Sequence, residues 1–240
     1  MAIAGFVAAE EVWVDWEREW IARLNRDNLT CFHRNELSHW PSSKRERLLE
    51  DLSTIILNHS PFRVGVAVIN EDLTGGTTPQ QQKEWHINGY SYAGRAASVE
   101  INEWRKSWGG KYPTMIFEDG DTGKGRLIDL FRRDKLPAPI FKPKRDRTHR
   151  KSGIVEKGIV PLQAADLYAY DIFSRARDIA KGKPLSRNFA SGINPIIERL
   201  TGRCGIATVG HVQFMADGMQ QRDALILQPS VKINTKDFIR

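Results

Sequence analysis

Two acidic residues, Asp166 and Glu118, stand in the sequence surroundings best suited to chemistry. Asp166 belongs to the segment 160–170, VPLQAADLYAY, where a proline suits the first turn of a helix. At about 100° per residue, four apolar residues share one arc of this helix: Leu162, Ala165, Ala169 and Phe173. Asp166 projects inside that arc, where a carboxylate is costly without a partner. We therefore expect either a hydrogen-bonded structural aspartate or a metal ligand.

Glu118 lies in a second acidic motif, residues 117–121, FEDGD, which follows an apolar run. It could supply the partner carboxylate for Asp166. Asp121 is either a third acid of the site or a turn residue beside Gly120, and Asp119 fits a turn or a cap. Carboxylates of this kind bind Mg²⁺ or Mn²⁺, and two such ions about 4 Å apart can promote phosphodiester hydrolysis. Structural ion pairs place acids in the same way, so both interpretations stay open.

A basic loop separates the two acidic motifs. Between Arg132 and Lys157, ten Lys and Arg residues stand against three acids, and prolines and Gly153 argue against regular structure. Such a loop either is simply solvated or contacts the phosphate backbone of a nucleic acid. The residues expected to make those contacts are Lys142, Lys144, Arg145, Arg147, Arg150 and Lys151.

Composition allows a nucleic-acid partner without requiring one. The 240 residues suffice for one domain with its own core, and the net charge of +7 makes a polyanionic partner plausible. The two cysteines, Cys31 and Cys204, form no zinc or disulfide pattern, which favours a reducing, cytoplasmic location. No apolar run is long enough to span a membrane.

Hydrophobic periodicity predicts one α/β domain in which helices alternate with strands. We expect helices over about 10–25, from 43, and over 88–107, 126–133, 161–181 and 195–200. We expect strands over about 2–9, 29–33, 62–69 and 114–117, and a loop over 71–83. The segments 206–215 and 224–228 are expected to be two strands, or one strand plus irregular segments. The tryptophans at 13, 16 and 20 share a helical face and are assigned to the core.

Five of these motifs together resemble the bacterial and phage family known as domain of unknown function 3800. The matching segments are AGFV at 4–7, WEREW at 16–20, FH at 32–33, FEDGD at 117–121 and PLQAADL at 161–167. They come in the family's order and span roughly residues 3–172. Residues from about 185 to 240 are a C-terminal extension that the resemblance does not cover.

The resemblance implies an RNase-H-like fold, a mixed sheet flanked by helices, over a single domain at 1–240. Enzymes of that fold cut or join phosphodiesters with acidic residues and divalent metal. By position, Glu118 matches the strand-end acid and Asp166 the helix acid. Gln163 could orient Asp166 or a bound water, and His33 matches an element at the edge of the site.

One family element, an N-terminal Asp-Glu-Ser-Gly strand, is missing here. It would be the first, central strand and would supply a further metal ligand. Either the true start lies upstream of Met1, which the other motifs favour, or the site is degenerate and a sheet edge is exposed. An exposed edge could invite strand pairing between copies of the chain.

The sequence thus predicts a divalent-metal-dependent nuclease or a degenerate relative, with Glu118, Asp166, Gln163 and His33 at the site. The alternative is a non-catalytic module that binds nucleic acid through an incomplete acidic site. A third hypothesis has the basic loop docking an acidic protein.

Overall fold

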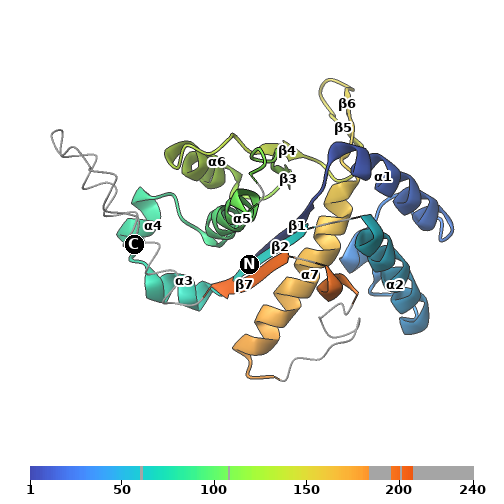
Figure 1. Cartoon of the computed structure of the whole chain (residues 1–240), viewed down its shortest axis with the longest axis horizontal. Coiled ribbons are helices and arrows are strands. Elements are labelled where there is room, and N and C mark those ends of the chain that lie inside the picture. Colours follow the sequence, from blue (N-terminus) through green and yellow to red (C-terminus); the bar gives the residue numbers. More distant parts are fainter. Residues whose placement is uncertain (60–61, 108, 184–195, 201, 208–240) are drawn as a thin grey trace.

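The computed structural model describes residues 1–59, 62–107, 109–183, 196–200 and 202–207. These residues form a mixed α/β structure, as expected from the sequence (Figure 1). The helices are α1 (Glu10–Asn25), α2 (Ser42–His59), α3 (Asn70–Gly76), α4 (Pro79–Glu84), α5 (Gly89–Lys106), α6 (Lys124–Arg133) and α7 (Pro161–Ala180), with 3₁₀ turns η1 (Arg34–Leu37) and η2 (Ile197–Arg199). The strands are β1 (Ala2–Val7), β2 (Phe62–Val68), β3 (Ile116–Glu118), β4 (Ile140–Lys142), β5 (Arg147–Thr148), β6 (Val155–Glu156) and β7 (Gly202–Ala207).

The largest sheet has the order β1-β2-β7. β1 runs antiparallel to β2, with Ala4 opposite Gly65, and β7 runs parallel to β2, with Cys204 opposite Gly65. In the part of the chain that the structure describes, β1 pairs with β2 alone. β3 and β4 form a separate parallel pair, and β5 and β6 form an antiparallel hairpin.

Helices cover both faces of the β1-β2-β7 sheet, because its strands carry apolar side chains on both sides. α7 crosses one face, where Tyr168 and Ile172 pack against Gly65 so closely that an added Cβ would lie 3.0 Å from Ile172. α5 covers the other face, where Val64 and Val66 belong to a cluster with apolar residues of α5. Successive side chains of β2 point to opposite faces of the sheet, because the period of a strand is two residues.

The tryptophan stripe of α1 packs in the core, as predicted. Trp16 and Trp20 are fully buried and stack with ring centroids 4.6 Å apart. They share a cluster with Leu48 and Leu52 of α2 and with residues of α7. This packing fixes α1 and α2 against α7 and, through it, the segment that precedes η1.

α5 and α6 support β3 from behind. Phe117 packs with Leu127 and Phe131 of α6, so the neighbouring Glu118 is turned to the opposite, exposed side of the strand. A buried ion pair between Arg95 of α5 and Asp134, just after α6, ties the two helices together. Packing behind β3 therefore holds Glu118, its last residue, in a defined position.

Several sequence predictions were wrong. Residues 71–83 are not a loop but include α3 and α4; Thr78 and Gln81 form a capping box and Pro79 stands at the first turn of α4. Residues 29–33 form no strand. The basic loop contains β4, β5 and β6. Of the two late strands predicted, the first begins earlier, as β7, and the rest of both lies outside the described residues.

Candidate acidic site

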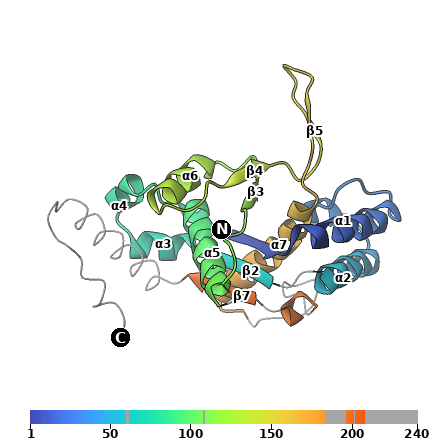
Figure 2. The same cartoon turned by 45° about the horizontal axis from the view of Figure 1, so that its top comes forward.

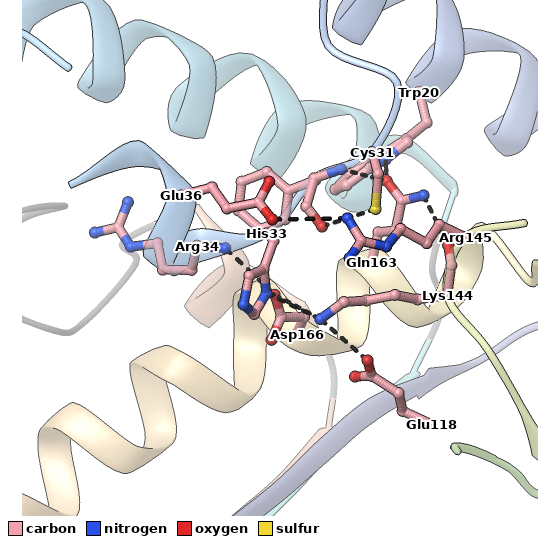
Figure 3. Close-up of polar contacts among 11 residues, drawn as sticks. Trp20, Cys31, His33, Arg34, Glu36, Glu118, Lys144, Arg145, Gln163 and Asp166 are labelled. Carbon is pink, nitrogen blue, oxygen red and sulfur yellow. Dashed lines mark hydrogen bonds and ion pairs between the residues drawn. The ribbon is translucent and has the colours of Figure 1, made fainter. Parts of the chain in front are cut away.

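Four side chains from different parts of the chain meet beside the start of α7 (Figure 3). Asp166 comes from α7, Glu118 from the end of β3, His33 from the residue before η1 and Lys144 from the segment after β4. Lys144 is the least accessible, with 11% of its side chain exposed, whereas Glu118 is 46% exposed. The expected pairing of a strand-end acid with a helix acid is present, but a lysine lies between them.

Asp166 lies at the side of α7, and of the four residues in the apolar arc proposed from the sequence only Leu162 is buried. Phe173, assigned to that arc, is 43% exposed. The buried stripe instead includes Ala164, Leu167 and Ile172. Packing against β1 and β2 determines which face of α7 is buried, and the helical periodicity of the sequence alone does not show this. Asp166 is therefore only partly buried, with 21% of its side chain exposed, and it does not face the core as the sequence predicted.

The partners of Asp166 come from the segment around His33. Oδ2 of Asp166 lies 2.9 Å from His33 Nδ1 and accepts a hydrogen bond from the Arg34 backbone N–H at 3.3 Å. The Arg34 guanidinium in turn lies over the ring of Tyr170 on α7, 4.9 Å from its centroid. The contacts of Arg34 fix the His33 segment against α7, a role that the sequence did not reveal.

The Lys144 ammonium is the centre of the cluster. Its Nζ lies 3.2 Å from Glu118 Oε1, 3.4 Å from Asp166 Oδ2 and 2.9 Å from His33 Nδ1. Two carboxylates of separate elements thus point at one cationic atom (Figure 3). The sequence placed Lys144 among residues that contact nucleic acid, whereas the structure places it between the two acids.

His33 Nδ1 stands between Lys144 and Asp166, and a single ring nitrogen cannot serve both at once. Without a proton, Nδ1 accepts from the lysine; with a proton, it donates to the carboxylate. The two contacts, both 2.9 Å long, are therefore alternatives. Which of the two contacts forms depends on whether Nδ1 carries the ring proton.

Gln163 does not orient Asp166; it joins the surrounding elements. Its Oε1 accepts from the Trp20 indole N–H at 3.0 Å and from the Phe32 backbone N–H at 2.8 Å. Its Nε2 donates to the Lys144 carbonyl oxygen at 3.0 Å. The residue is 2% exposed, so its amide is a buried junction between α1, the His33 segment and Lys144.

The other two acids of the FEDGD motif have local partners. Asp121 Oδ1 accepts from the Gly123 backbone N–H at 2.7 Å, which is the turn role that the sequence left open beside the metal role. Asp119 pairs with Lys124 at 2.7 Å and with Arg147 at 2.8 Å. Hydrogen bonds from Lys124 and then Arg147 hold the pKa of the Asp119 carboxyl below its usual value.

Most of the six basic residues proposed to contact nucleic acid have acidic partners. Lys142 lies 3.5 Å from Glu156, Arg145 lies 3.7 Å from Glu36, and Arg147 contacts both Asp119 and Glu156. Arg150 and Lys151 are exposed and pair with no carboxylate of the described residues. The positive charge is thus neutralised near the site and unpaired farther out along the loop.

All of the cluster except Asp166 lines a pocket of about 360 Å³. Its lining includes Glu118, His33 and Lys144, together with Arg145 and Arg147. Cys31 lies nearby but is buried, and burial raises the pKa of its thiol, which opposes formation of a nucleophilic thiolate. The accessible chemistry of the pocket is therefore that of carboxylate, imidazole and cationic groups.

The donor types around Lys144 suit a divalent cation, because Mg²⁺ and Mn²⁺ prefer carboxylate oxygens. Within the described ranges, however, no group of three His, Cys, Asp or Glu side chains is arranged to hold a metal ion. The atom toward which the two carboxylates converge is the lysine nitrogen. The arrangement thus fits a cation, and in this conformation the cation is an ammonium.

No model of a protein family, no curated protein and no solved structure matches this chain. Across the residues that the structure describes, no helix is long and apolar enough to cross a membrane.

Proposed function

We propose that this protein hydrolyses phosphodiester bonds of nucleic acid, with Glu118 and Asp166 as its acidic pair. One observation carries the proposal: two carboxylates, from a strand end and a helix, lie within 3.4 Å of the same cationic nitrogen. Convergence on a positive charge at an accessible pocket is what a cation-assisted site needs. The sequence resemblance, with its RNase-H-like fold, adds the expectation of phosphodiester chemistry.

The residues of the chain have distinct roles in this proposal. Glu118 and Asp166 would hold Mg²⁺ or Mn²⁺, which would activate water and stabilise the leaving oxygen. Lys144 would leave the centre and neutralise a substrate phosphate at the pocket. His33, hydrogen-bonded to Asp166, would hold or release a proton at Nδ1. Arg145 and Arg147, which line the pocket, would fix the phosphate backbone.

The RNase-H-like fold is part of the proposal. It is supported by a sheet with helices on both faces and by acids at a strand end and on the helix that crosses the sheet. The described strands form three separate sheets, β1-β2-β7, β3-β4 and β5-β6, and a complete RNase-H-like sheet would be continuous. The family's additional strand would pair with the edge of β1 to which no described strand is bonded.

Asp166→Asn tests the function directly. The substitution keeps the size of the side chain and removes its charge, so we expect Mn²⁺-dependent cleavage of DNA and RNA to be lost while the circular dichroism spectrum stays native. Asp178→Asn is the matched control, because Asp178 lies on the same helix and pairs with Arg177, outside the cluster. Equal cleavage by wild type and Asp166→Asn would refute the assignment.

The alternative is a non-catalytic nucleic-acid-binding module, and the position of Lys144 favours it. An ammonium between the two carboxylates already offsets one of their two negative charges without a metal. This alternative predicts salt-sensitive binding that a chelator does not change, without cleavage. If the basic segment docks an acidic protein instead, nucleic acid will fail to compete for that partner.

A further inference from the structure

The β5–β6 hairpin projects away from the body of the molecule, beside the pocket (Figure 2). Arg147 pairs with Glu156 and Thr148 with Val155, and the ladder continues through a bond from the His149 N–H to the Ile154 carbonyl at 2.9 Å. The chain reverses at Gly153, whose φ of +66° favours glycine. The result is a short two-stranded ribbon with an ordered turn.

The base of the ribbon is anchored by paired charges. Arg147 bonds both Asp119, which follows β3, and Glu156 across the hairpin, each at 2.8 Å. Asp146 pairs with Lys157 at 2.6 Å and accepts from the Gly158 N–H at 3.0 Å. These contacts join the hairpin to the segment that carries Glu118, so its direction relative to the pocket is fixed.

The tip of the ribbon, residues 148–155, has the opposite character. Its sequence, THRKSGIV, contains no acid, and Arg150 and Lys151 pair with no carboxylate of the described residues. Ile154 is 64% exposed and Val155 is 53% exposed. Since neighbouring strand residues face opposite sides, the ribbon presents an apolar side chain on each face.

We propose that this tip binds the major groove of duplex DNA, with Arg150 and Lys151 on phosphates and Ile154 and Val155 against base edges. The charge is complementary, and the exposed apolar groups suit contact with thymine methyl groups. The major groove of B-form DNA admits a two-stranded ribbon, whereas the deep, narrow major groove of A-form RNA does not. Duplex DNA is then the substrate of the proposed function. Binding at the tip stands by itself, but its link to cleavage rests on that function.

Fluorescence anisotropy of the full chain in a chelator measures binding without cleavage. The probes are a labelled DNA duplex longer than one helical turn and an RNA duplex of the same sequence. We expect the wild type to prefer the DNA. Arg150→Ala with Lys151→Ala should weaken DNA binding about tenfold and reduce the log–log salt slope by about 1 to 2 units. Ile154→Thr should reduce the preference for DNA and leave the salt slope unchanged.

Two control variants distinguish the effect of the tip residues from the effect of the protein's net charge. Arg150→Lys with Lys151→Arg keeps both charges and should bind like the wild type. Arg26→Ala with Arg47→Ala removes two exposed charges, one just after α1 and one on α2, and it should leave binding almost unchanged. Circular dichroism checks the fold of each variant.

Three outcomes would overturn the inference: no binding of duplex DNA by the wild type, equal binding of the RNA duplex, or equal losses in the tip and control variants. Binding of polyglutamate in place of DNA would assign the tip to an acidic protein. The test is independent of catalysis. If Asp166→Asn cleaves normally, the proposed function fails while tip binding stands; if the tip variants bind normally and Asp166→Asn is inactive, only the inference fails.

Discussion

Gln163 donates a hydrogen bond from Nε2 to the carbonyl oxygen of Lys144 at 3.0 Å. The same buried amide accepts from Trp20 and from the Phe32 backbone. It therefore links the aromatic core of α1 to the lysine that lies between the two site carboxylates. Loss of this junction affects stability and site geometry together, because the contacts share one side chain.

Gln163→Met should destabilise the fold by about 2 to 4 kcal/mol, because methionine has a similar size and leaves the Trp20 and Phe32 N–H groups without their acceptor. Urea denaturation measures the change. Gln80→Met is the control: Gln80 bonds Glu84 on an exposed face of α4, so its loss should cost less than about 0.5 kcal/mol. Similar losses in both variants would show that the buried junction contributes little.

Lys144→Met should strengthen Mn²⁺ binding, since the metal no longer competes with an ammonium for Glu118 and Asp166. A unit charge about 4 Å away contributes about 1 to 4 kcal/mol, so affinity should rise at least about fivefold. Isothermal titration calorimetry measures this directly, without reference to activity. Lys151→Met, which removes a lysine from the ribbon tip, is the control and should change the affinity little. Weaker metal binding by Lys144→Met would mean that the lysine helps to build the site.

The contribution of Asp119 to the free energy of unfolding should decrease at acid pH. Hydrogen bonds from Lys124 and Arg147 lower its folded pKa below the ordinary value of 3.8. The lowered pKa stabilises the folded state above about pH 4 to 5, and this contribution is lost as pH falls through the folded pKa. Asp119→Asn should therefore be less stable than the wild type at neutral pH, and the gap should close in acid. Urea unfolding curves at a series of pH values test this, and a gap independent of pH would contradict it.

The regular elements were predictable because local patterns determine them. The boundaries of α1, α5 and α7 follow from helical periodicity and from terminal residues such as Pro161 and the glycine pair at 109–110. α3 and α4 were missed because the glycines and polar run of 71–83 dominate the composition, although the Thr78–Gln81 capping box was readable. Local sequence therefore predicts long amphipathic elements better than short polar ones.

The site was predictable only in part, because its geometry depends on tertiary contacts. The Phe-His and FEDGD motifs and the PLQAAD segment pointed to His33, Glu118 and Asp166, which do come together. Nothing in the spacing of the basic loop distinguishes Lys144, which turns into the cluster, from Lys151, which lies on the ribbon. The role of Gln163 also depends on Trp20, far away in sequence. Tertiary packing decides which of several chemically similar residues joins the site. The periodicity of the sequence does not show that packing.

The ion pair between Arg95 and Asp134 should be essential for the support behind β3. Its side chains are only 5% and 9% exposed. Arg95→Met would leave a buried carboxylate without this guanidinium, which costs about 3 to 5 kcal/mol, whereas Arg95→Met with Asp134→Leu should recover much of the loss. Arg132→Met breaks an exposed pair with Asp129 and should cost less than about 1 kcal/mol. Urea denaturation ranks the four proteins. Because α5 and α6 pack behind Phe117, Arg95→Met should also displace Glu118 and lower the rate of cleavage. If that variant is as stable as the wild type, apolar packing alone holds β3.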